Sequence, residues 1–144
     1  MADEIVPSEQ SGQTPLVLVA DDDAGIGQLI AEVVERLGLA PVVASDGIVA
    51  VRLATEHKLR LCCAILDVRM PQLGGIEAAQ QIRQFIPNLP IVLMSAAFPR
   101  DYERRIAPLR IASVLSKPFQ LAELIGLMGP FVAAPSVVER QAGV

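Results

Sequence analysis

One stretch of the chain decides the fold: CCAILDVRMPQLGGIEAAQQIRQF, residues 62–85. It begins with an apolar run that ends at Asp67, which predicts a short buried strand. Pro71 ends such a strand, and the pair Gly74-Gly75 allows a tight entry into a helix. Helical spacing of apolar residues then predicts a helix over 75–85. Its inward positions are Ile76, Ala79, Ile82 and Phe85.

The alternation of strand and helix continues on both sides of this stretch. Short runs rich in Val, Ile and Leu predict four more strands, at 16–20, 41–45, 90–95 and 112–117. Helical spacing predicts helices at about 26–37, 46–57, 99–107 and 119–128, with Gly38 as the cap that ends the first. Continuous apolar strands separated by helices are typical of a parallel sheet covered on both faces. The pattern therefore predicts a doubly wound α/β fold.

The 144 residues suit a single domain, and 52% of them are hydrophobic, so the chain has enough apolar surface to fold. We expect the folded domain at 15–132, a flexible N-terminal tail at 1–14 and a C-terminal tail at 133–144, because both ends lack a regular apolar period. Cys62 and Cys63 lie in an apolar run, where neighbours point to opposite faces of a sheet. We interpret both as buried thiols.

Charge and hydropathy exclude two kinds of partner. A net charge of -4 and a pI near 4.9 argue against direct binding of nucleic acid. No apolar run approaches the ~18 to 20 residues that cross a bilayer, so we expect no membrane insertion. The N-terminus carries acidic residues and lacks the apolar segment of a signal peptide, which predicts a cytoplasmic protein.

Polar residues follow four of the predicted strands. The first strand is followed by Asp21-Asp22-Asp23, the third ends at Asp67, and the fourth and fifth lead to Ser95 and Lys117. Since the carboxyl ends of parallel strands share one edge of a sheet, we expect these groups to lie together. Singly, each has an ordinary explanation as a helix cap, a turn residue or a solvated charge. Only their joint placement indicates a functional site.

The chemistry of this set favours phosphoryl transfer. Carboxylates gathered at one edge repel one another unless a proton or a cation lies among them, and Mg²⁺ suits a few carboxylates that share it with water and phosphoryl oxygens. Lys117, one of only two lysines, adds a positive charge at the end of an apolar strand. A carboxylate nucleophile, a divalent cation, an ammonium and a hydroxyl are the groups that phosphoryl transfer requires.

Four segments resemble the marker segments of the receiver domain of two-component response regulators. The four segments are VLVADDDAGI, AILDVRMPQLGGIEAAQQIR, IVLMSAA and VLSKPF. They lie within about residues 15–130 and occur in the family's order and at the family's separations. The resemblance implies a flavodoxin-like (βα)5 fold, in which five parallel strands are arranged in the order 2-1-3-4-5.

The resemblance assigns roles to the acidic residues by position. Asp67 corresponds to the phosphoacceptor. Asp21 and Asp22 correspond to the acidic pair that holds Mg²⁺, together with Asp67 and the backbone carbonyl of Arg69. Asp23 is left as a helix cap.

Three more residues have counterparts around the phosphoryl group. Ser95 corresponds to the hydroxyl that moves toward it, and Ala96 to the small residue that leaves it room. Lys117 corresponds to the ammonium that pairs with it.

One position departs from the family pattern. Three residues before the lysine, where many members have a Tyr or Phe that rotates as a switch, this chain has Val114. Phe98 and Tyr102 are then candidates for residues that report movement of Ser95, although the simpler interpretation is that Phe98 packs and Tyr102 is a surface residue.

The resemblance implies a phosphoacceptor response regulator in a phosphorelay. Asp67 takes a phosphoryl group from the phosphohistidine of a sensor histidine kinase or a histidine phosphotransfer protein, and thereby switches a surface that binds a downstream protein target. Such domains also hydrolyse their own acyl phosphate, so we expect self-directed chemistry and not a conventional enzyme. The alternative is a receiver-fold interaction module that acts without phosphorylation.

Two surfaces are candidates for protein contact, because no output domain is recognisable after residue 132. The segment 100–110 is rich in arginine and is either a solvated face or a docking patch for carboxylates. The helix 119–128 has more apolar residues than one buried face needs. We therefore expect a homodimer through this helix, or a tail folded over it.

Two other classes of protein fit less well. A phosphatase-like hydrolase with an Asp nucleophile has a second Asp two positions later, where this chain has Arg69. A dinucleotide-binding loop needs glycine where this chain has Gln28 and Ile30, and the acidic residues beside them repel pyrophosphate.

Overall fold

The computed structural model describes residues 13–132. The C-terminal tail expected at 133–144 lies outside the described residues, and so does the N-terminal tail apart from Gln13 and Thr14. No helix in the described part of the chain is long and apolar enough to cross a membrane.

Five parallel strands form one sheet in the order β2-β1-β3-β4-β5, which confirms the fold expected from the sequence. The strands are β1 (Leu16–Ala20), β2 (Ala40–Ala44), β3 (Leu61–Asp67), β4 (Ile91–Ser95) and β5 (Ser113–Ser116). Every residue of β1, β3 and β4 is buried, as the continuous apolar runs predict for strands covered on both faces.

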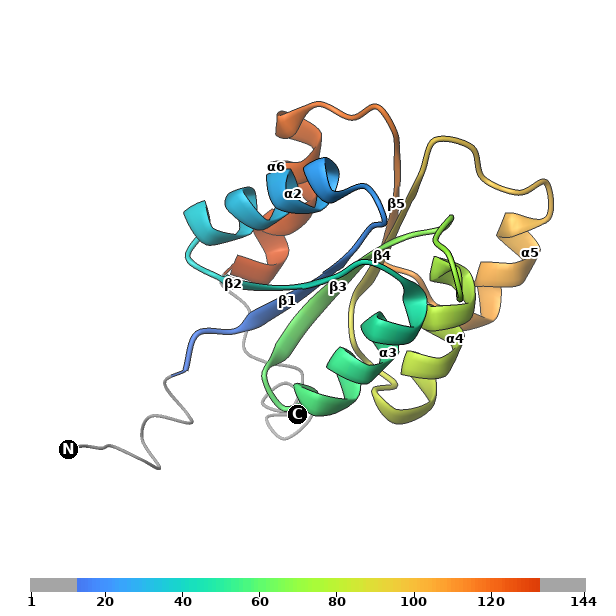
Figure 1. The fold of residues 1–144 in the computed structure, drawn as a ribbon, viewed down its shortest axis with the longest axis horizontal. Coiled ribbons are helices and arrows are strands. Elements are labelled where there is room, and N and C mark those ends of the chain that lie inside the picture. Colours follow the sequence, from blue (N-terminus) through green and yellow to red (C-terminus); the bar gives the residue numbers. More distant parts are fainter. Residues whose placement is uncertain (1–12, 133–144) are drawn as a thin grey trace.

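Helices connect the strands and cover both faces of the sheet (Figure 1). They are α2 (Ala24–Arg36), α3 (Gly47–Glu56), α4 (Gly75–Phe85), α5 (Tyr102–Ile106) and α6 (Leu121–Val132), with a short 3-10 helix η1 (Ala107–Leu109) after α5. Helices α2 and α6 lie on one face, and α3, α4 and α5 on the other.

Two helices differ in extent from the sequence expectation. The helix expected at 99–107 is short and passes into η1, because the second residue of that turn is Pro108, which has no N–H to continue the α-helical bonding. Helix α6 instead runs on to Val132, since Met128 and Phe131 are buried in the core and keep its inward face in use. The end of α2 is as expected: Gly38 has a φ of 85°, and the N–H groups of Gly38 and Leu39 donate to the carbonyls of Glu35 and Val34, as at a helix that glycine ends.

The two faces of the sheet have separate hydrophobic cores. Alternate β1 residues divide between them: Leu18 packs with α3 and α4, whereas Val17 and Val19 pack with α2 and α6. Helix α6 contributes Leu124, Met128 and Phe131 to the second of these cores. This arrangement leaves the carboxyl ends of all five strands at one edge, where the connecting loops begin.

The expectation that Cys62 and Cys63 lie on opposite faces is wrong. Leu16 pairs with Leu61 but Val17 pairs with Cys63, so the register shifts and leaves one extra residue on β3. Such an irregularity breaks the alternation of side chains along a strand. Both cysteines are fully buried, as expected, but both belong to the core on the α2 and α6 side.

Candidate functional site

The ends of β1, β3, β4 and β5 bring together every side chain that the sequence assigned to the site. These residues line one hollow of about 400 Å³: Asp21, Asp22, Asp23, Asp67, Arg69, Ser95, Ala96 and Lys117. Backbone hydrogen bonds beyond the strands hold this edge in register, because the N–H of Asp21 donates to Ala44 and that of Lys117 donates to Ser95. Residues far apart in the sequence therefore meet at a fixed place.

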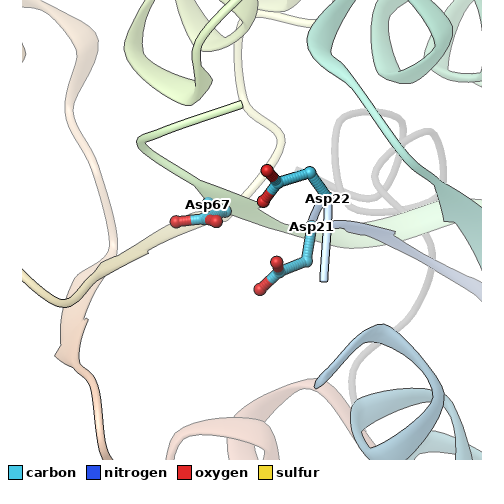
Figure 2. A group of neighbouring side chains, drawn as sticks. All are labelled: Asp21, Asp22 and Asp67. Atoms are coloured by element: carbon cyan, nitrogen blue, oxygen red, sulfur yellow. The ribbon is translucent and has the colours of Figure 1, made fainter. Parts of the chain in front are cut away.

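Three carboxylates converge in the hollow (Figure 2). Asp21 and Asp22 follow β1, and Asp67 ends β3. Each offers one oxygen, and the three oxygens lie within 4.8 Å of one another. Asp21 and Asp67 are 3% and 4% exposed, whereas Asp22 is open to solvent, so a cation could enter from the side of Asp22.

Lys117 joins two of these carboxylates. Its Nζ donates to Asp21 Oδ2 at 2.7 Å and to Asp67 Oδ2 at 3.2 Å. Burial alone lowers the pKa of Lys117, but the hydrogen bonds and negative charges of Asp21 and Asp67 outweigh it and raise that pKa. The two carboxylates therefore favour the charged form of the ammonium, which lies beside Asp67.

The pKa of Asp67 is raised from its ordinary value. Burial is the main cause and the negative charge of Asp21 adds to it, while Lys117 acts in the opposite direction. One ammonium thus compensates two buried carboxylates incompletely. A divalent cation among the three carboxylates would supply the missing positive charge, and oxygen ligands of this type suit Mg²⁺.

Backbone groups fix the direction of the carboxylates. The N–H of Asp23 donates to Asp21 Oδ1 at 2.8 Å, and that of Arg69 donates to Asp67 Oδ1 at 3.4 Å. Asp23 caps α2, since its Oδ1 accepts from the N–H groups of Gly25 and Ile26, as expected from the sequence. The carboxylate of Asp23 therefore caps α2, and it is not among the three carboxylates that converge.

Gly75 lets α4 begin directly behind Asp67. A Cβ atom at Gly75 would lie 2.2 Å from the backbone oxygen of Asp67, so no other residue fits without moving α4 from β3. Its N–H donates to the carbonyl of Val68. The glycine that the sequence indicated as a turn residue therefore has a second role, which only the packing reveals.

Ser95 is 1% exposed and ends β4 beside Lys117. Its Oγ donates to the carbonyl of Ala97 at 2.9 Å and accepts from the N–H of Ala97 at 3.1 Å. The hydroxyl therefore holds the loop after β4, and its one proton is engaged by the carbonyl of Ala97. Ala96 lines the hollow beside it.

The residues considered for a switch lie away from this hollow. Val114 is 40% exposed on β5. Phe98 and Tyr102 form an aromatic pair with ring centroids 4.8 Å apart and pack against the core beneath α5. Tyr102 is half-buried, and its N–H donates to the carbonyl of Pro99.

Sequence reasoning missed an ion pair that joins α4 to α5. The guanidinium of Arg105 donates to the carboxylate of Glu77, two residues after Gly75. The two residues are far apart in the sequence, and neither has a distinctive neighbour, so no local signal could have paired them. The pair connects the helix behind Asp67 to the short helix after β4.

Comparison with known proteins agrees with this geometry. The model of the response regulator receiver domain matches residues 17–128. Transcriptional regulatory protein PdtaR of Mycobacterium tuberculosis is 39% identical over 110 residues, which cover 76% of this chain and 52% of that protein. Protein-glutamate methylesterase/protein-glutamine glutaminase 4 of Myxococcus xanthus is 36% identical over 106 residues, covering 71% of this chain and 29% of that protein.

A solved structure shares both sequence and fold. The receiver domain of the Francisella response regulator 1452 is 31% identical, with a TM-score of 0.71, and the match covers 83% of this chain and 97% of that one. The chain belongs to the family of response regulator receiver domains, the class found in two-component systems. The match spans between 29% and 52% of the length of the first curated relatives.

Proposed function

We propose that this protein is a phosphoacceptor of a phosphorelay, in which Asp67 receives a phosphoryl group from a phosphohistidine. The observation that supports this most directly is the position of the Asp67 carboxylate, which lies at the wall of an open hollow, 3.2 Å from the ammonium of Lys117. The donor is a sensor histidine kinase or a histidine phosphotransfer protein.

In the transfer, a carboxylate oxygen of Asp67 forms a bond to phosphorus while the bond between phosphorus and the imidazole nitrogen of the donor breaks. The electron pair of that bond stays on the imidazole, and the product is an acyl phosphate. Lys117 neutralises part of the charge on the phosphoryl oxygens, because its Nζ already lies beside the acceptor oxygen. Asp21 keeps this ammonium in place.

The proposed cofactor is Mg²⁺, held by Asp21, Asp22, Asp67 and the backbone carbonyl of Arg69. When bound, it would neutralise charge on the carboxylates and on the phosphoryl group. The three convergent carboxylate oxygens and the raised pKa of Asp67 support this assignment, since both indicate a shortage of positive charge.

The acyl phosphate acts as a switch through Ser95. A phosphoryl group adds roughly two negative charges and three acceptor oxygens beside this hydroxyl. Ser95 then exchanges its bonds to Ala97 for one to the phosphoryl group, which releases the loop that leads to α5. The output is a changed surface for a downstream protein, and the only chemistry is self-directed phosphotransfer and hydrolysis in the cytoplasm.

A specific observation supports an alternative function, an interaction module that needs no phosphorylation. Val114 stands where an aromatic switch was expected, and it is 40% exposed on β5. A partner that binds this surface constantly would not require an acyl phosphate.

One measurement distinguishes the phosphoacceptor from the interaction module. The protein is incubated with Mg²⁺ and acetyl phosphate, and its intact mass is recorded for the wild type, Asp67→Asn and Asp23→Asn. We expect one phosphoryl addition in the wild type and in Asp23→Asn, since asparagine also caps a helix, and none in Asp67→Asn. If the folded wild type binds Mg²⁺ but gains no mass from acetyl phosphate or from a phosphorylated kinase, the interaction module is the better explanation.

A further inference from the structure

Of the five strands that the structure describes, only β2 ends without a residue that lines the hollow. The turn that follows β2, residues 44–47, contacts the site through its backbone instead. On one side of the turn, the carbonyl of Ala44 accepts from the N–H of Asp21 at 3.1 Å. The position of Asp21, whose carboxylate is one of the three that converge, is thus tied to this turn.

The other side of the turn lies against the loop that carries Arg69, residues 68–74. Gly47 is buried, and a Cβ atom there would overlap the carbonyl oxygen of Leu73 and lie 2.7 Å from its carbonyl carbon. Backbone atoms cannot swing aside as the end of a flexible side chain can. Helices α3 and α4, which pack side by side (Figure 1), therefore approach this closely only because glycine begins α3.

Hydrogen bonds fix both the loop and the start of α3. The N–H of Val68 donates to the carbonyl of Met94 at 2.8 Å, and that of Gly75 donates to the carbonyl of Val68 at 3.0 Å. Asp46 caps α3, because its Oδ1 accepts from the N–H of Val49 at 2.9 Å. An atom inserted between the turn and the loop therefore moves either the turn, which holds the acids after β1, or the loop, which follows β3.

We propose that Gly47 is a positioning residue of the Mg²⁺ site. Its missing side chain sets the distance between the two acids that follow β1 and the residues that end and follow β3. Mg²⁺ demands near-ideal octahedral geometry at short ligand distances, so a small shift between the two halves of the site weakens its binding. Strand β2 thus contributes to the site through a backbone contact and not through a ligand. This inference rests on the proposed Mg²⁺ site, to which it adds a residue that the sequence did not indicate.

The test is a titration of the full chain with Mg²⁺, followed by the amide chemical shifts in NMR spectra. In Gly47→Ala we expect the dissociation constant for Mg²⁺ to rise by about tenfold, as for other residues that orient metal ligands without binding the metal. Ala54→Gly is the matched control. It also changes one methyl group on the buried side of α3, roughly 10 Å further along the helix, and it also destabilises that helix. We expect its dissociation constant to equal that of the wild type, because a purely structural effect would be shared by both variants.

A second pair of variants applies if Gly47→Ala does not fold. Asp46→Ala and Asp46→Asn remove the same charge, but only asparagine can keep the bond that caps α3. We expect Asp46→Ala to bind Mg²⁺ about threefold more weakly than Asp46→Asn, because the first turn of α3 no longer holds the loop firmly.

Equal affinity of Gly47→Ala and Ala54→Gly for Mg²⁺ overturns the proposal, and so does equal affinity of the two Asp46 variants where Gly47→Ala is unfolded. If the wild type itself does not bind Mg²⁺, the positioning role fails together with the proposed cofactor. If the wild type binds Mg²⁺ and gains mass from acetyl phosphate but the variants match their controls, only the positioning role fails, and the proposed function stands.

Discussion

Lys117 is the residue on which both buried carboxylates of the site depend. Its side chain is 17% exposed, and those of Asp21 and Asp67 are 0% and 6% exposed, so all three charges are largely withdrawn from water. Removing one partner of a buried ionic group leaves the others uncompensated, which costs more than the attraction itself. A single lysine therefore compensates the charge of two buried carboxylates.

We expect Lys117→Met to lower the free energy of unfolding by about 2 to 3 kcal/mol in the absence of divalent ions. Mg²⁺ should restore part of this loss, because it binds the folded state and supplies positive charge to the same carboxylates. Urea unfolding with and without Mg²⁺ measures both effects. Lys58→Met is the control, since Lys58 is the other lysine and lies exposed after α3, and an equal loss in this variant would contradict the explanation.

The raised pKa of Asp67 predicts that a neutral residue at this position raises the free energy of unfolding, whereas Lys117→Met lowers it. Because burial favours the protonated carboxyl in the folded state, the fold binds this proton more tightly than the unfolded chain does. Stability then falls as the pH rises from the unfolded value of 3.8 through the higher folded pKa. Asp67→Asn removes this cost, so we expect it to unfold at higher urea concentration than the wild type at neutral pH without Mg²⁺. At pH 3 the two proteins should differ least; a gap of the same size at both pH values would contradict this cause.

At the scale of elements, the tight contact between α4 and β3 controls the position of Asp67. A Cβ atom at Gly75 meets the backbone oxygen of Asp67 at 2.2 Å, and backbone cannot swing aside as a flexible side chain can. We expect Gly75→Ala to destabilise the domain by about 2 kcal/mol or more, because α4 must move away from the strand that carries Asp67. Thermal and urea unfolding measure this loss.

Gly126 provides the matched substitution. It also lies inside a helix, α6, but a Cβ atom there meets nothing within 4 Å. Gly126→Ala should leave stability unchanged or raise it by roughly 0.5 to 1 kcal/mol, through the higher helix propensity of alanine. If both alanines had the same effect, helix propensity and not the close approach to Asp67 would explain the result.

The strands and the site residues could be predicted from the sequence because one physical rule governs both. Strands buried on both faces are continuous apolar runs, and their carboxyl ends must share an edge, so the polar residues that follow them must meet. What the sequence does not contain is the detail of packing. The extra residue at Cys62, the early end of α5 and the pairing of Glu77 with Arg105 all depend on contacts between distant elements.

On the scale of the whole molecule, burial is uneven across the sheet. Strands β1 and β3 are buried throughout, whereas β5 alternates between buried and exposed residues and lies at the edge. Helix α5 has no buried residue. The segment from α5 through β5 therefore has little buried surface, and it directly follows the loop that Ser95 holds.

Hydrogen exchange can test whether this weak segment is the part that responds to Asp67. Segments with little buried surface open with a small free energy, so we expect amides of 102–116 to exchange faster than those of β1 and β3. Treatment with Mg²⁺ and acetyl phosphate should change exchange mainly in 97–116, because Ser95 gives up its bonds to Ala97 when it reaches the phosphoryl group. Ser95→Ala should take up phosphate but lose this local response. Equal changes in α2 and α3 would mean that the acyl phosphate acts on the whole domain and not through the loop after β4.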